Sequence, residues 1–277
     1  MTTQRKLEQV ITGMPATDGA GVELVRVIGQ PKLMDLDPFL LLDAFRSDNP
    51  DDYIAGFPAH PHRGFETVTY LLDGRMRHKD NAGNEGVIEP GGIQWMTAGK
   101  GIVHSEMPEQ ENGLLEGFQL WINLPASHKM SEPAYQEHDA DNIPVETRAG
   151  TSIRVITGET SQGTQGPVKQ PLTSPLYLDV TLKADTDFSE ILAESHNAFV
   201  YVINGSVALG EHKLERDQLA VLSKGEEIQL RSEQSGARFL LIAGKPLGEP
   251  IARGGPFVMN TNAEVHQAFT DYQTGRF

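Results

Sequence analysis

Two pairs of residues that can bind a metal ion lie roughly forty positions apart, His60-Pro61-His62 and His104-Ser105-Glu106. Within each pair the two side chains are separated by one residue, so in a β-strand both point to the same face, with Cα atoms about 6.6 Å apart. If the two strands pair, three imidazoles and one carboxylate converge on one point. This mixed nitrogen and oxygen set suits a divalent transition metal and leaves open positions for substrate or O2. The spacing therefore predicts a metal site on paired strands.

The residues around both pairs favour strands closed by tight turns. The first pair leads into the strand-like run Glu66–Leu72, which ends at Asp73-Gly74, a hairpin turn signal. The second pair follows the turn formers Pro90-Gly91-Gly92 and Gly99-Lys100-Gly101. Random placement of the 9 histidines would give roughly 0.3 His-x-His pairs, so the spacing of one pair is weak evidence by itself. The strand and turn signals around both pairs are the stronger evidence for the metal site.

Composition excludes several classes of protein. The formal net charge of -15 argues against direct binding of nucleic acid or of an anionic membrane surface. The sequence contains no run of 18 apolar residues, so no membrane-spanning helix is predicted. The first residues lack the apolar segment of a secretory signal. The sequence contains no cysteine, which excludes disulfides and cysteine zinc sites. We therefore expect a cytoplasmic protein.

The pattern of apolar residues predicts an all-β protein with few short helices. In Glu116–Leu124, apolar residues at every second position form one face, and Gln119, Trp121 and Asn123 form the other, as expected for a pocket wall. A short helix is expected over 263–272. Further strands are predicted over 21–28, 39–42, 66–72, 75–79, 86–88, 93–96, 153–157, 176–182, 198–203, 218–222 and 238–243.

An internal similarity predicts two β-barrels in tandem. Phe199–Gly205 resembles Val68–Gly74, since both are strand-like runs that end in Asn-Gly or Asp-Gly. The polar, proline-interrupted segment 125–144 is typical of a linker. We therefore expect a metal-binding barrel over 1–140 and a second barrel over 145–277. The second lacks both the His-x-His and the His-x-Glu pair, so no metal site is expected there.

Three longer motifs resemble the pirin family. They are His-Pro-His-Arg-Gly-Phe-Glu-Thr-Val over 60–68, Gln-Trp-Met-Thr-Ala-Gly-Lys-Gly-Ile-Val-His-Ser-Glu-Met over 94–107 and Gly-Pro-Phe-Val-Met-Asn-Thr over 255–261. The segment Leu36–Asp43 fits the same pattern, so the resemblance extends over nearly the whole chain. It implies a bicupin fold, in which two cupin barrels of the jelly-roll type, also called double-stranded β-helices, follow each other in one chain.

The resemblance also implies a metal and its ligands. It implies iron, as Fe(II), bound by His60, His62, His104 and Glu106 in the first barrel, and no metal in the second. The ligand types alone do not distinguish iron from manganese, nickel, copper or zinc. The general cupin pattern instead takes its carboxylate from Glu66, which would otherwise orient a ligand imidazole. The pirin pattern favours Glu106 over Glu66.

Two functions follow as hypotheses. Pirin-like proteins are associated with quercetin 2,3-dioxygenase activity, which implies an oxidoreductase that opens a flavonol-like aromatic substrate with O2. Glu106 would then be the catalytic base, and Phe65, Met96, Met107 and Trp121 are candidates for the apolar wall. Eukaryotic relatives are known as transcriptional regulators. The alternative is therefore a non-enzymatic, metal-binding regulatory protein that acts through a protein partner.

Overall fold

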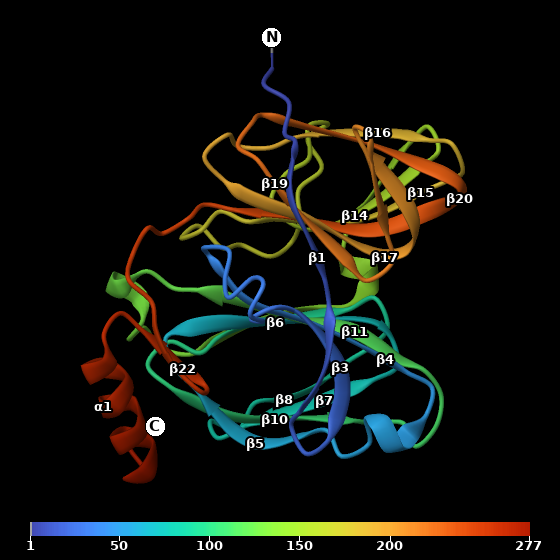
Figure 1. Cartoon of the computed structure of the whole chain (residues 1–277). Coiled ribbons are helices and arrows are strands. Elements are labelled where there is room, and N and C mark those ends of the chain that lie inside the picture. Colours follow the sequence, from blue (N-terminus) through green and yellow to red (C-terminus); the bar gives the residue numbers. More distant parts are fainter. Residues whose placement is uncertain (1) are drawn as a thin grey trace. The chain divides into compact units, whose positions relative to one another are not determined.

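The computed structural model describes residues 2–277 and consists mainly of β-strands (Figure 1). Its contacts divide the chain into two compact units. The N-terminal unit comprises 15–29, 39–140 and 247–277, and the C-terminal unit comprises the stretch up to Met14, 30–38 and 141–246. The predicted all-β fold is confirmed. Among residues 2–277, the helices are too short or too polar to cross a membrane.

The N-terminal unit contains two sheets that pack face to face. A seven-stranded sheet has the order β12-β9-β6-β11-β4-β3-β2, and a four-stranded sheet has the order β5-β10-β7-β8. Buried apolar side chains from both sheets, such as Leu71 and Met76, form a shared core. The strands are β2 (Met14–Asp18), β3 (Val22–Ile28), β4 (Phe39–Ser47), β5 (Phe57–His62), β6 (Phe65–Asp73), β7 (Met76–Asp80), β8 (Glu85–Ile88), β9 (Ile93–Thr97), β10 (Ile102–Pro108), β11 (Leu115–Asn123) and β12 (Ala134–His138).

Three further elements near the C-terminus belong to the same unit. β21 (Ala252–Gly254) and β22 (Phe257–Met259) form a two-stranded hairpin. The helix α1 (Asn262–Gln273) follows it and begins with a capping box, in which the Thr261 hydroxyl accepts from the Glu264 N–H and the Glu264 carboxylate accepts from the Thr261 N–H. The short helix expected over 263–272 is therefore confirmed. Single 3-10 turns lie at Pro50–Asp52, Ala126–His128 and, at the junction with the C-terminal unit, Ala140–Asn142.

The C-terminal unit is built around a nine-stranded sheet. Its main path has the order β1-β19-β17-β20-β15-β14-β13, with β16 paired to β20 and β18 paired to β17. The side chains facing the interior are almost all aliphatic, with Phe188 and Phe239 in edge-to-face contact. The strands are β1 (Leu7–Thr12), β13 (Val145–Arg148), β14 (Thr151–Thr157), β15 (Leu176–Leu182), β16 (Asp187–Ile191), β17 (Asn197–Leu209), β18 (His212–Glu215), β19 (Gln218–Leu222) and β20 (Glu227–Gly244).

The predicted strands lie where expected, but two aspects of the organisation differ from the sequence analysis. The segment 125–144 is not only a linker, because Ala134–His138 forms β12 and pairs with β9. The two units also differ from the continuous halves 1–140 and 145–277 at both chain ends and at 30–38, which belongs to the C-terminal unit. β1 pairs with β19 in the C-terminal unit, whereas the hairpin and α1 belong to the N-terminal unit. β12 is polar and its partner β9 lies far away in the sequence, so the local residue pattern did not indicate a strand there.

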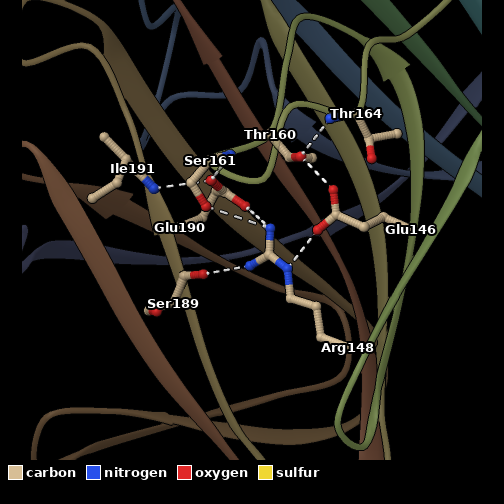
Figure 2. Close-up of polar contacts among 8 residues, drawn as sticks. All are labelled: Glu146, Arg148, Thr160, Ser161, Thr164, Ser189, Glu190 and Ile191. Atoms are coloured by element: carbon tan, nitrogen blue, oxygen red, sulfur yellow. Dashed lines mark hydrogen bonds and ion pairs between the residues drawn. The ribbon is translucent and has the colours of Figure 1, made fainter.

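A cluster of charged and polar side chains lies within the C-terminal unit (Figure 2). The Arg148 guanidinium at the end of β13 donates to Glu146 at 2.5 Å, to Glu190 at 2.6 Å and to the Ser189 carbonyl at 2.8 Å. Glu146 also accepts a short hydrogen bond from the Thr160 hydroxyl. Because Glu190 is fully buried and Glu146 nearly so, each carboxylate depends on this guanidinium for charge compensation.

Arg148→Met should therefore destabilise the C-terminal unit by about 2–3 kcal/mol, because two buried carboxylates lose their compensating cation. Access of water to part of the site limits the loss to this range. Chemical denaturation followed by circular dichroism measures this loss. The control is Arg231→Met, which removes an exposed ion pair with Asp187 and should leave the unfolding free energy unchanged. Equal stability of the two variants would contradict a structural role for the cluster.

Candidate metal centre

The two predicted ligand pairs lie on neighbouring antiparallel strands. His104 of β10 is directly opposite His60 of β5, and Ile102 is opposite His62. A register irregularity follows His104, so that Glu106 is opposite Phe57. Along β10 the side chains of Ile102, His104 and Glu106 are buried while their neighbours are only partly so, as the two-residue period requires.

The three imidazoles converge as the spacing predicts. One ring nitrogen from each of His60, His62 and His104 can be chosen so that all three lie within 4.8 Å of one another. The ring centroids are 4.7 Å apart for His60 and His62, 4.5 Å for His60 and His104, and 5.0 Å for His62 and His104. Among residues 2–277, these are the residues that form a metal-compatible cluster of three or more.

The surroundings keep two of these histidines neutral. Burial, and then the neighbouring imidazoles, lower the pKa of both His62 and His104 well below the usual histidine value. His60 Nδ1 lies 2.8 Å from the Pro58 carbonyl oxygen. A carbonyl only accepts, so Nδ1 carries the proton and Nε2 is left with a free lone pair. Neutral imidazole is the form that binds a metal.

The hydrogen-bonding state of the cluster fits a bound metal. Both ring nitrogens of His104, and Nδ1 of His62, are buried without a hydrogen-bond partner. Buried polar atoms of this kind are rare in folded proteins because each one loses its interaction with water. A divalent transition metal would satisfy one nitrogen of each imidazole, and the nitrogen-rich donor set suits such an ion. The residues present therefore fit the group that the fold implies.

The two rival carboxylates have different surroundings. Glu106 accepts a hydrogen bond from the Thr69 hydroxyl at 2.8 Å, and its second oxygen is 3.5 Å from Gln119 Nε2. It lines the cavity described below but is outside the group of converging atoms. Glu66 accepts from the Thr97 hydroxyl at 2.7 Å and does not line that cavity. A fourth ligand stays a prediction, with Glu106 favoured by its position.

A cavity of about 610 Å³ within the N-terminal unit is lined in part by His60 and His62, whereas His104 does not line it. Gln119 and Trp121 contribute to its wall, as predicted for that face of β11, whereas Asn123 does not line the cavity and instead accepts a hydrogen bond from Lys129. Of the four candidate apolar residues, Trp121 lines the cavity, whereas Phe65, Met96 and Met107 do not. The other apolar lining residues are Ala20, Leu24, Leu41, Phe45, Phe57, Pro58, Met76 and Pro256.

Sequence reasoning missed residues that the fold brings to the site. Arg253 and Pro256 of the hairpin line the cavity, although they are far from the ligand pairs in sequence. The motif over 255–261 marked this region without indicating its place. His78 is buried on β7 opposite Glu106, with Nε2 at 2.9 Å from Glu137.

Comparisons with known proteins agree with this architecture. Residues 21–122 match the family described as Pirin, and residues 177–277 match the Pirin C-terminal cupin domain. A pirin-like protein of Caulobacter vibrioides is 52% identical over 99% of both chains. A Pseudomonas aeruginosa protein named provisionally as a quercetin 2,3-dioxygenase is 51% identical, also over 99% of both. The crystal structure of quercetin 2,3-dioxygenase from Acinetobacter baumannii superposes with a TM-score of 0.92 at 35% identity, covering 99% of this chain and 98% of that one. The chain belongs to the pirin family, and its two barrels are cupins.

Proposed function

We propose that the protein is a metal-dependent dioxygenase of the quercetin 2,3-dioxygenase type, which opens a flavonol-like ring with O2. The observation that carries the proposal is the cavity of about 610 Å³ whose wall includes Glu106 and two of the three clustered histidines, His60 and His62. A regulatory protein could bury its metal, whereas an enzyme must leave it accessible to substrate. The names of the Pseudomonas and Acinetobacter relatives support the same activity.

The ligand set supports Fe(II) or another divalent transition metal, with His60, His62 and His104 as ligands and Glu106 as the fourth. When bound, the metal supplies Lewis acidity that lowers the pKa of a substrate hydroxyl, together with redox chemistry toward O2. The products expected from a flavonol and O2 are the ring-opened ester and carbon monoxide, so that every atom of both reactants is accounted for.

Glu106 is the residue best placed to remove the proton of the substrate hydroxyl. Its carboxylate lines the cavity, and the Thr69 hydroxyl and Gln119 amide hold it from one side. These two contacts fix the orientation of the carboxylate, so less entropy is lost when it reaches the geometry needed for proton transfer. The apolar walls around Leu24 and Phe45 exclude water and complement a planar aromatic ring.

Glu106→Gln should retain much of the metal yet lose turnover by about 100- to 10,000-fold, because an amide cannot accept the proton. Metal content per chain and the steady-state rate with a flavonol measure the two effects separately. The control is Glu116→Gln, which alters a carboxylate on β11 that pairs with Arg46 outside the cavity. Unchanged turnover in Glu106→Gln would exclude Glu106 as the base.

A comparison of two substrates tests the reaction itself. The metal-loaded protein should consume O2 with quercetin but not with the corresponding flavone, which lacks the hydroxyl at position 3. That hydroxyl is the group that binding to the metal and to Glu106 would activate. Oxygen uptake measured with an electrode distinguishes the two. Equal rates with both compounds would indicate non-specific oxidation and contradict the proposal.

A further inference from the structure

An arginine that the proposed mechanism does not use lies in the wall of the cavity. Arg253 belongs to β21 and lines the same cavity as His60 and His62. Its guanidinium carbon is 4.7 Å from the centre of the Trp121 ring, and that ring is 5.3 Å from the ring of His62. A permanent cation and a candidate metal ligand therefore both contact the same indole.

The surrounding structure holds this guanidinium in place. Arg253 stacks on the indole and donates through Nη1 to the Leu40 carbonyl at 3.2 Å. Its hairpin is fixed to the end of the ligand strand, because Val258 N donates to the Arg63 carbonyl at 3.0 Å and Arg63 N to the Pro256 carbonyl at 3.3 Å. A side chain ordered in this way loses little further entropy when it binds a ligand.

The second arginine of the cavity has a different setting. Arg26 donates to both oxygens of Asp43, at 2.9 and 2.7 Å, and to Asp18 at 2.8 Å. These contacts form a bidentate pair with a buried carboxylate and a further exposed ion pair. Arg26 is thus paired with two carboxylates. Arg253 stacks on the face of Trp121, and its charge also opposes the rise in the pKa of Asp43 that burial causes.

We propose that Arg253 selects aromatic substrates that carry an anionic oxygen group, with a carboxylate as the best match. The ring hydroxyl of such a substrate would face the histidines, and its carboxylate would meet the guanidinium. A planar guanidinium presents parallel N–H donors that match a carboxylate, and stacking on an aromatic face is a typical setting for it. Because Arg253 is itself exposed, the match of charge and geometry, rather than burial, would give the selectivity.

This inference deepens the proposed function and depends on it for the reaction, but not for binding. Quercetin lacks a carboxylate, so it would be accepted as a neutral analogue and would make no use of this charge. The physiological substrate would then be a hydroxylated aromatic acid of similar size. Arg253 acts in this account as a specificity-determining residue that contacts the substrate away from the ring that opens.

A pair of matched probes tests the inference without turnover. 6-Hydroxy-2-naphthoate and 6-hydroxy-2-naphthamide differ in charge at about pH 6.5 but hardly in shape. Their hydroxyl and acyl groups lie at opposite ends, so one metal cannot chelate both. Binding to the metal-loaded full chain is measured by isothermal titration calorimetry without oxygen, for wild type, Arg253→Gln, Arg253→Lys and Arg46→Gln. Arg46 is a surface residue of the same unit and serves as the control.

Wild type and Arg46→Gln should bind the acid about tenfold more tightly than the amide, as expected for a charge-assisted contact. Arg253→Gln should weaken binding of the acid about tenfold and that of the amide less than about twofold. Arg253→Lys keeps the charge without the planar fork, so its loss should be intermediate, and it gives a second measurement if the glutamine variant folds poorly. Equal binding of both probes by wild type, or a preference retained in Arg253→Gln, would overturn the inference.

The same data separate this inference from the proposed function. Selective binding of the acid together with no O2 uptake on any flavonol would leave the inference standing and remove the dioxygenase. Oxygen uptake with quercetin together with equal binding of the two probes would leave the dioxygenase standing and remove the role of Arg253.

Discussion

Replacing His104 with alanine is expected to abolish stoichiometric metal binding and all metal-dependent turnover. The three imidazoles converge from β5 and β10, and His104 provides the contribution of β10. Removing one of the three histidine ligands should lower metal affinity by more than about 100-fold, since even the loss of a supporting residue costs about 10- to 100-fold. Metal analysis of the purified variant, after equilibration with limiting Fe(II) or Zn²⁺, measures the loss.

The fold should survive this substitution. Both ring nitrogens of His104 lack hydrogen-bond partners, so alanine removes no protein hydrogen bond, although it leaves a small cavity. His266→Ala changes an exposed histidine on α1 and is the control for the effect of losing any histidine. Full metal occupancy in His104→Ala with unchanged affinity would show that the histidine cluster is not the metal site.

Lys129→Met is expected to cost the largest share of stability, about 3–5 kcal/mol in the N-terminal unit. The Lys129 ammonium is buried and donates to three oxygens, the Gly64 carbonyl at 2.8 Å, Asn123 Oδ1 at 2.7 Å and the Val258 carbonyl at 2.9 Å. Burial lowers the pKa of Lys129 to about 8, so the group still carries its charge at neutral pH. Methionine fills similar space but leaves three buried acceptors unpaired.

The unfolding free energy from guanidinium titration measures this cost. Lys100→Met is the matched control, because Lys100 is half-exposed and pairs with the exposed Glu132, a contact that contributes little. A loss below about 1 kcal/mol in Lys129→Met would show that the three hydrogen bonds do not hold the hairpin to the turn after β5. The variant should also bind metal less tightly, since Gly64 follows the ligand strand closely.

Much of the N-terminal unit could be predicted because its signals are local. The ligand pairs, the turn at Asp73-Gly74 and the alternation along β11 each occupy a few consecutive residues, and strand geometry converts their spacing into a face. The sequence analysis expected the two ligand strands to pair, and in the structure His60 lies directly opposite His104.

The rest could not be predicted, because it depends on contacts between residues far apart in sequence. No pattern near Arg253 indicates that it stacks on Trp121, and none near His78 indicates Glu137 as its partner. The pairing of β1 with β19 is likewise a long-range choice among several strands of similar composition. Glu66 and Glu106 both fit a cupin pattern in the sequence, and only the fold shows that Glu106 lines the cavity.

The most direct test of the account is simultaneous measurement of O2 consumption and carbon monoxide release with quercetin. The protein is purified without oxygen, loaded with Fe(II) and compared with its metal-free form and with His104→Ala. We predict that the loaded protein consumes O2 and releases carbon monoxide in equal amounts. The other two samples should neither consume O2 nor release carbon monoxide. Stoichiometric bound metal with no oxygen uptake, or uptake that persists in His104→Ala, would contradict the account.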